Sequence, residues 1–364
     1  MEDYYQMENK YVKMDRRKFL KASLIGSSSL LLPNSLFASQ KNKFHFIMPP
    51  KPFEYYIKEG KEKGGRILLI GGIHGNEEGG YKASDILIDT DIKKGTLAIL
   101  PRSNPESIFT NKRGYNGDMN RKFANLSPKD EDFYKVNSIK NFIAEFKPDV
   151  VLSLHDGYGF YAKHHNQWGE CIVIDEKAYN GIDLYTPAKY VSDVLKKAGF
   201  NIPINNTHTF KKETHHKEQR KSLTYYTLQE HNIPAFCIEG SKQTSLERKV
   251  QIHLLALKEF FNIYNVEIEP TFEYLISNID KLTKPKPTHI IAYINNQKKL
   301  ITHHQEIKVP KGSEIKFEIT NNRAGGLIAH GVNVNYKSFH YKNSLTFYVK
   351  NDKISEYRFN IIKG

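Results

Sequence analysis

Short apolar runs alternate with longer stretches of helical periodicity between about residue 43 and residue 265. The short runs predict strands at residues 67–72, 96–100, 149–154, 171–174 and 235–238. Apolar residues spaced three and four apart predict helices at residues 79–89, 131–146, 190–198, 222–230 and 245–264. Strands that alternate with helices indicate an α/β domain, with a mostly parallel or mixed sheet flanked by helices.

The pattern changes after residue 265. Residues 266–287 end in Lys284-Pro285-Lys286-Pro287, which is typical of a linker. Beyond it, alternating runs separated by turns predict strands near 289–294, 306–309, 314–320, 344–350 and 356–362. We therefore expect a small all-β sandwich at residues 288–364. It shows no catalytic group of its own, so we interpret it as an accessory module with a wall or protein partner.

The N-terminus predicts export. Arg16-Arg17-Lys18 precedes an uncharged segment from Ala22 to Pro33, and small residues follow around Ala38. This order is typical of a secretory signal, here residues 1–38, and the paired arginines resemble a twin-arginine signal. The apolar segment is shorter than the ~20 residues that a spanning helix needs. We expect a periplasmic protein without stable membrane insertion after cleavage; an uncleaved N-terminal anchor is the alternative.

Composition narrows the classes of protein further. Hydrophobic residues make up 39% of the chain, which is enough to bury a core. The net charge is +14, but the basic residues form no long run, so a basic surface is favoured over nucleic-acid binding. Cys171 and Cys237 both lie in apolar runs, where two buried thiols are favoured over one disulfide bridge.

Three metal-ligand residues follow two of the predicted strands. His74 and Glu77 come directly after strand 67–72, and His155 comes directly after strand 149–154. In such sheets the loops beyond the carboxyl ends of the strands form the ligand site. Two histidines and a glutamate, with one open position, form a catalytic zinc set. The sequence therefore predicts one zinc ion bound by these residues. For each histidine alone, the alternative is a hydrogen-bonded residue at a strand end.

Other polar residues can supply the remaining chemistry. Glu239 follows strand 235–238, where partial burial would raise its pKa and suit it to proton transfer. Without a metal nearby, a surface glutamate would be the better interpretation. Arg121 can bind a carboxylate through two hydrogen bonds, and Asn120 can add a third. Arg113 can stabilise an oxyanion.

These motifs resemble those of the funnelin zinc carboxypeptidases. They resemble more closely the helical-cell-shape-determining peptidoglycan DL-carboxypeptidases of curved Gram-negative bacteria. The likeness covers most of residues 43–265, and it includes residues 113–124, 154–161, 168–170, 221–225 and 234–239. It implies a zinc carboxypeptidase-like catalytic domain at residues 43–265, followed by the β sandwich. Two features differ: these relatives can carry glutamine at the position of His74, and they usually have more C-terminal β structure.

The resemblance also implies an activity. The protein would be a zinc metallocarboxypeptidase that trims the peptidoglycan stem L-Ala-γ-D-Glu-meso-diaminopimelate to a dipeptide and releases meso-diaminopimelate. Asn120 and Arg121 would bind the terminal carboxylate, Glu239 would act first as base and then as acid, and Tyr225 would close over the substrate.

Two alternatives stay open on the sequence alone. One is an amino-acid N-deacylase of the desuccinylase or aspartoacylase kind, which resembles the funnelins in its ligand and Asn-Arg motifs. The other is a non-catalytic protein that binds the cell wall through a degenerate site. Export argues against the first, because free acylated amino acids are mostly cytoplasmic. The complete set of ligands, base and clamp argues against the second.

Overall fold

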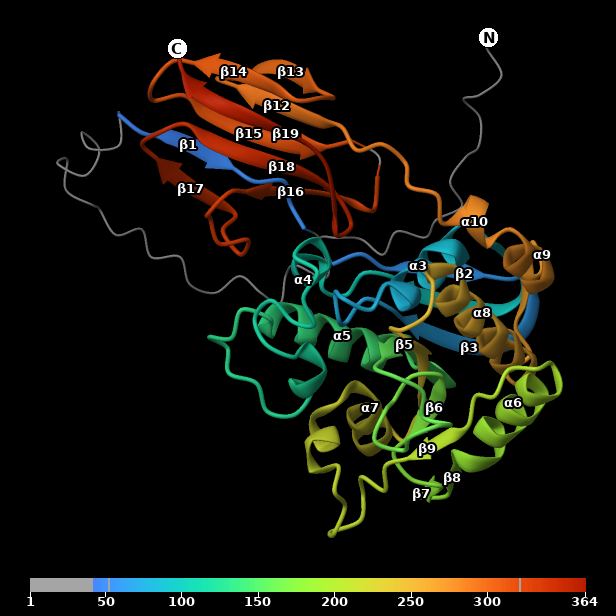
Figure 1. Cartoon of the computed structure of the whole chain (residues 1–364). Helices are drawn as coiled ribbons and strands as arrows, with labels where there is room; N and C mark the ends of the chain where they lie inside the picture. The colour runs from blue at the N-terminus through green and yellow to red at the C-terminus, as the bar shows by residue number, and fades with distance from the viewer. Residues whose placement is uncertain (1–41, 52, 321) are drawn as a thin grey trace.

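The computed structural model describes residues 42–51, 53–320 and 322–364, so the predicted signal at residues 1–38 lies outside the described residues. Figure 1 shows a larger domain of helices and strands beside a smaller domain built from strands. Among the described helices, none combines the length and apolar character needed to cross a membrane.

An eight-stranded mixed sheet forms the centre of the larger domain. The strand order is β11-β4-β3-β5-β10-β6-β9, with β2 beside β4. The central strands run parallel to one another, in the order β4, β3, β5 and β10. Antiparallel pairs join β2 and β11 to β4, and β6 to β10. The strands are β2 (Tyr56–Glu59), β3 (Glu62–Ile70), β4 (Asp91–Leu100), β5 (Val150–Gly157), β6 (Cys171–Ile174), β9 (Ile204–Asn206), β10 (Ala235–Ser241) and β11 (Glu267–Glu269).

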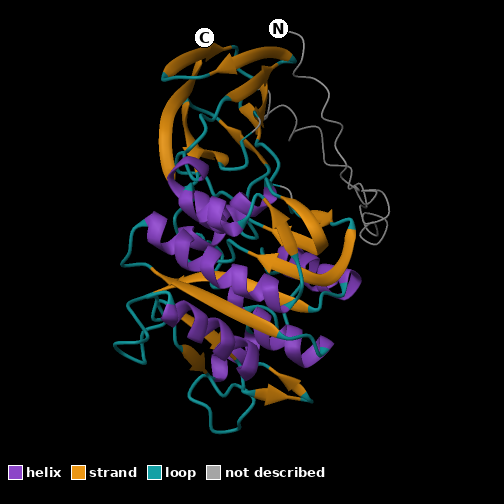
Figure 2. Cartoon of the chain, turned by 90° about the vertical axis from the view of Figure 1, so that its right-hand side faces the viewer, coloured by secondary structure: helices purple, strands orange, loops and turns teal. Residues whose placement is uncertain are grey.

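Helices cover both faces of this sheet (Figure 2). Side chains of β3 alternate between two buried clusters: Ile67 and Leu69 pack with α3, α6 and α8, whereas Leu68 and Ile70 pack with α5. Burial on both faces explains why the central strands are continuous apolar runs. The α/β class predicted from the sequence is confirmed. The helices are α3 (Glu78–Ile88), α4 (Pro105–Phe109), α5 (Phe133–Phe146), α6 (Tyr185–Lys197), α7 (Leu223–His231) and α8 (Leu246–Ile263), with the short elements η1 (Met119–Arg121), β7 (Ala178–Tyr179), β8 (Ile182–Asp183) and η2 (Lys217–Lys221).

Most of residues 266–287 do not form the linker that the sequence suggested. Strand β11 pairs with β4, and the helices α9 (Phe272–Ser277) and α10 (Ile279–Leu282) follow it. The side chains of Ile268, Phe272, Leu275 and Ile279 are buried in the same core as α8. Because these side chains share that core, the segment belongs to the larger domain.

The smaller domain is the predicted β sandwich, with one unexpected strand. Its sheets have the orders β13-β12-β15-β1-β17 and β14-β19-β18-β16. Strand β1 (Phe44–Ile47) lies between β15 and β17, and Phe44 and Phe46 are buried in the sandwich core. The boundary expected at residue 43 must be corrected, because pairing and burial assign β1 to the accessory domain. The other strands are β12 (Ile290–Ile294), β13 (Gln297–Ile301), β14 (Gln305–Val309), β15 (Glu314–Ile319), β16 (Gly325–Ala329), β17 (Ser338–Tyr341), β18 (Leu345–Asn351) and β19 (Ile354–Lys363).

Buried ion pairs join the two domains at the turn between β18 and β19. Asp352 in this turn pairs with Arg102 and lies 2.7 Å from Lys82 Nζ on α3. The guanidinium of Arg102 also contacts Asp85 on α3, at 2.6 Å. Because Arg102 and Asp352 are almost fully buried, each of their charges depends on its partners for stabilisation.

We predict that Asp352→Asn destabilises the protein. The substitution leaves the buried Arg102 with one carboxylate partner, so the free energy of unfolding should fall by about 3 kcal/mol. Asp193→Asn is the control, since Asp193 forms an exposed pair with Lys189 that should contribute little to stability. Urea unfolding followed by circular dichroism measures both. Equal effects of the two substitutions would contradict a stabilising role for the interface.

Candidate metal centre

The loop after β3 holds two of the predicted ligands in a tight backbone conformation. The carbonyl groups of Gly71 and Gly72 accept hydrogen bonds from the backbone of Ser103 and Asn104. At Gly75, a Cβ atom would lie 1.9 Å from the carbonyl carbon of Ser107, so only glycine fits there. This packing turns His74 and Glu77 inward, where they are 2% and 3% exposed.

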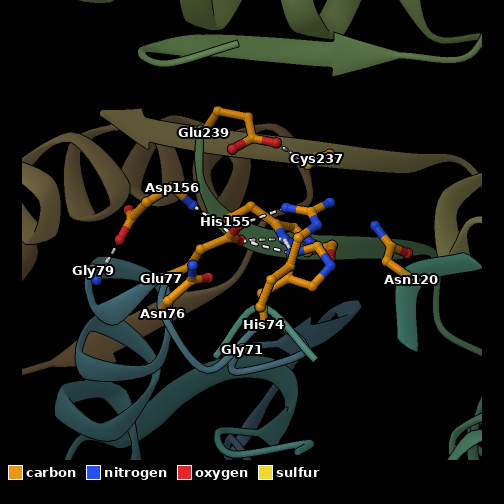
Figure 3. A network of polar contacts seen from close by, with 12 residues as sticks. Gly71, His74, Asn76, Glu77, Gly79, Asn120, His155, Asp156, Cys237 and Glu239 are labelled. Carbon is orange, nitrogen blue, oxygen red and sulfur yellow. Dashed lines mark hydrogen bonds and ion pairs between the residues drawn. The ribbon is translucent and has the colours of Figure 1, made fainter. Parts of the chain in front are cut away.

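His155 comes from the neighbouring strand β5 and meets the loop residues at one point (Figure 3). Glu77 Oε2 lies 2.9 Å from His74 Nδ1 and 2.8 Å from His155 Nδ1, and the two ring nitrogens are 3.0 Å apart. Metal–ligand bonds of about 2.0–2.1 Å in a tetrahedral site separate ligand atoms by roughly 3 Å. The three predicted ligands therefore come together, and their atoms fit a single metal ion.

The second nitrogen of each histidine also has a partner. His74 Nε2 lies 2.8 Å from Asp118 Oδ1, and His155 Nε2 lies 3.0 Å from Ser153 Oγ. Such outer contacts fix the orientation of metal-binding imidazoles. Asp118 was missed from the sequence, although it precedes the Asn120-Arg121 pair. It also begins η1, because its side chain accepts a hydrogen bond from the backbone of Asn120 at 2.9 Å.

Electrostatics keeps the ligand carboxylate charged. Burial alone would raise the pKa of Glu77, but the charge of His74 and hydrogen bonds with both histidines hold this pKa well below its usual value. Burial likewise opposes ionisation of Asp118, whose pKa is lowered overall by His74 and Arg113. Burial lowers the pKa of His155, which favours the neutral imidazole that metals bind.

Glu239 lies beside His155, as the two residues are directly paired between β10 and β5. Its side chain is buried, and Oε1 accepts a hydrogen bond from the thiol of Cys237 at 3.4 Å. Within the described part of the chain, Oε2 has no hydrogen-bond partner. Burial, and then the nearby charge of Glu77, raise the pKa of Glu239 well above its usual value. A carboxyl group in this state is suited to accept and return a proton.

The predicted substrate clamp lies on the loop that reaches His74. Arg113 donates from Nη1 to Glu77 Oε1 at 3.0 Å and from Nε to Asp118 Oδ2 at 2.9 Å. Asn120 Oδ1 accepts from the backbone of Leu223 at 3.0 Å. Arg121 lines a cavity of about 550 Å³ whose other walls include Trp168 and residues 213–219. The guanidinium is thus available to an anion in this cavity.

Tyr225 and the two cysteines lie at different places around this region. The ring of Tyr225 stacks on Phe210, with centroids 4.5 Å apart, so its closing over a substrate stays a prediction. Cys171 and Cys237 are free and buried, as the sequence analysis favoured.

Two further residues contact the site and were not found from the sequence. Lys242 Nζ lies 3.0 Å from Glu77 Oε1. Asp156, next to His155, accepts a hydrogen bond from the backbone of Gly79 at 2.7 Å and lies 3.1 Å from His253 Nε2. Lysine and aspartate are common in loops, so their types alone give no signal; only the folded contacts show their place.

Comparisons with known proteins identify the class and then the family. The fold and the His-Glu-His group are those of a metallocarboxypeptidase. The family described as carboxypeptidase controlling helical cell shape, catalytic, matches residues 51–284, which is more than half of the chain. The protein belongs to this family.

Solved structures from one bacterium are similar to the chain. The apo form of the cell shape determinant protein Csd4 from Helicobacter pylori is 26% identical, with a TM-score of 0.67, over 86% of this chain and 76% of that chain. The mDAP-bound form of H. pylori Csd4, a D,L-carboxypeptidase, is 24% identical, with a TM-score of 0.61, over 84% and 76%. Carboxypeptidase 2 of Trichophyton rubrum is 28% identical over 103 residues, and the match spans 18% of its length.

We predict that Asp118→Asn weakens metal binding. Asparagine can still begin η1, but it removes the charge that orients His74, so affinity for the metal should fall about 10- to 100-fold. Competition with a chelator measures the dissociation constant for zinc. Asp130→Asn is the control, because Asp130 pairs with Lys122 in the same region. An unchanged affinity in Asp118→Asn would show that this contact does not support the site.

We also predict that Glu239→Gln stabilises the metal-free protein at neutral pH. Folding raises the pKa of Glu239. The folded protein therefore loses stability as the pH rises above 4.5, the ordinary pKa of a glutamate side chain. Glutamine keeps the shape without titrating, so the variant should be more stable by about 1–3 kcal/mol at pH 7. The difference should vanish below pH 4.5 in urea unfolding. Glu145→Gln, at an exposed position, is the control. A wild-type protein more stable than Glu239→Gln at pH 7 would refute the burial argument.

Proposed function

We propose that the protein is a zinc-dependent peptidoglycan DL-carboxypeptidase that trims tripeptide stems to dipeptides and releases meso-diaminopimelate. The observation that carries the proposal is the meeting of His74, Glu77 and His155 beside the buried carboxyl group of Glu239, in a member of this carboxypeptidase family. Two nitrogens and one carboxylate oxygen form a donor set that suits zinc.

The residues around the metal divide the reaction between them. A zinc ion held by the three ligands would supply Lewis acidity toward the scissile carbonyl group. Glu239 accepts a proton from the attacking water and returns it to the leaving amide nitrogen, which its raised pKa favours. Arg113, held between Glu77 and Asp118, presents guanidinium N–H groups that stabilise the developing oxyanion.

We assign substrate binding to the clamp residues and to the cavity that Arg121 lines. Arg121 and Asn120 hold the terminal carboxylate, since a guanidinium group matches a carboxylate through paired hydrogen bonds. The crystallised mDAP-bound and tripeptide-bound forms of the H. pylori relative support a ligand derived from peptidoglycan. Family membership and the complete site favour a carboxypeptidase over both an N-deacylase and a non-catalytic wall-binding protein.

The place of action is part of the proposal. Residues 1–38 would direct the folded protein to the periplasm, where its polymer substrate lies. The net charge of +14 would favour approach to an anionic polymer. A wall or protein partner for the β sandwich stays a prediction.

The proposal predicts a defined change in muropeptides. Purified protein with zinc should convert tripeptide muropeptides to dipeptides with release of diaminopimelate, as resolved by mass spectrometry. Glu239→Gln should lower turnover at least about 100-fold while metal content is unchanged, because the proton carrier is lost. Arg121→Ala should raise KM for substrates with a free terminal carboxylate, but not for amidated ones. Normal cleavage by Glu239→Gln would disprove the mechanism, and unchanged muropeptides with wild-type protein would disprove the function.

A further inference from the structure

Lys242 provides a positive charge next to the metal site that the mechanism above does not use. It follows β10, the strand that carries Glu239, and its backbone N–H donates to the carbonyl group of Gly157 at 2.9 Å. Its ammonium group lies 3.0 Å from Glu77 Oε1 and 3.4 Å from Asn76 Oδ1. The side chain is 25% exposed, so a ligand can reach it.

The ammonium group lies on the side of His74 away from Asn120. In Figure 3, Asn76 and Asn120 lie on opposite sides of His74, and Lys242 contacts Asn76. A peptide whose terminal carboxylate binds Arg121 and whose scissile carbonyl lies at the metal site must extend past the clamp on its acyl side. Lys242 is therefore placed to meet the residue on the acyl side of the scissile bond.

The charges around Glu77 leave Lys242 available to an anion. Arg113 is paired with both Glu77 and Asp118, whereas Glu77 is the one carboxylate within 4.0 Å of Lys242 in the described part of the chain. A metal ion held by Glu77 would also attract that carboxylate, which would weaken its pairing with Lys242. The ammonium group of Lys242 has three N–H donors. Two of them can be used by Asn76 Oδ1 and Glu77 Oε1, so the third is available to a substrate.

We propose that Lys242 recognises the free α-carboxylate of a γ-linked glutamyl residue on the acyl side of the scissile bond. This inference rests on the proposed function and names how the same site would select its peptide. In a γ-linked glutamyl peptide the scissile amide involves the side-chain carboxyl group, so the α-carboxylate stays ionised about 5 Å from the scissile carbonyl carbon. A neutral residue on the acyl side has no anion at that place, so Lys242 discriminates between acidic and neutral residues there.

Two substrates distinguish recognition of the substrate carboxylate by Lys242 from a role in which Lys242 only stabilises Glu77. One is L-Ala-γ-D-Glu-meso-diaminopimelate, and the other is its amide, in which a carboxamide replaces the α-carboxylate. The wild-type protein should prefer the acid by about 10- to 100-fold in kcat/KM, as expected for a charge-assisted hydrogen bond. The Lys242→Met variant should cleave the acid and the amide with equal kcat/KM, at the value that the wild-type protein shows for the amide. Lys242→Arg should restore part of the preference, and Lys197→Met, on an exposed face of α6, should retain all of it.

A binding measurement gives a readout independent of turnover. Calorimetry with the dipeptide L-Ala-γ-D-Glu and the zinc-loaded Glu239→Gln protein should show weaker binding when Lys242→Met is added. Chelator competition should show similar zinc affinity with and without Lys242→Met. A loss of zinc that lowers turnover of both substrates equally would overturn the proposal, because Lys242 would then support only the metal site.

The outcomes also distinguish this inference from the function on which it rests. If the wild-type protein cleaves neither substrate, the proposed function fails. If it cleaves the acid and the amide equally well, the function stands and the role of Lys242 is disproved. Equal preference for the acid in wild type and Lys242→Met would disprove it as well.

Discussion

The carboxylate of Glu77 is the group on which the site depends. It is buried, and removing such a charge from water costs several kcal/mol unless partners stabilise it. One oxygen contacts His74 and His155, and the other contacts Arg113 and Lys242. Each of these partners comes from a different part of the chain, so a correct fold is needed before the carboxylate can be both buried and charged.

This requirement extends beyond the ligands to the elements that hold them. Asp156 accepts a hydrogen bond from the backbone at the start of α3, the helix that begins directly after Glu77. The first residue of that helix, Glu78, pairs with Lys249 of α8 and with Lys353 of the β sandwich. The accessory domain therefore contacts the segment that places a metal ligand. Its position in the chain, 200 residues and more from the loop, gave no indication of this contact.

The sequence predicted the residues whose chemistry is distinctive and missed those whose role is set by contact. Periodicity was sufficient for the central strands and helices, because burial on both faces of a sheet leaves continuous apolar runs. His74, Glu77 and His155 could be found because few other residue types bind zinc, and each follows such a run. Asp118 and Lys242 have types that occur in any loop. Strand β1 was assigned to the wrong domain because its partners β15 and β17 follow about 270 and 290 residues later, and pairing across such separations leaves no local pattern.

The pKa values of two glutamates at this site, Glu77 and Glu239, are shifted in opposite directions, and their surroundings account for the difference. Glu77 is surrounded by imidazole, guanidinium and ammonium groups, which lower its pKa. Glu239 is paired with a thiol and faces the charge of Glu77, so burial and repulsion raise its pKa. The lowering of one pKa contributes to the raising of the other, since the charge kept on Glu77 disfavours a second charge nearby. Carboxyl groups whose environments separate their pKa values take different roles. Here the residue with the lowered pKa is suited to bind the metal, and the residue with the raised pKa is suited to accept a proton and return it.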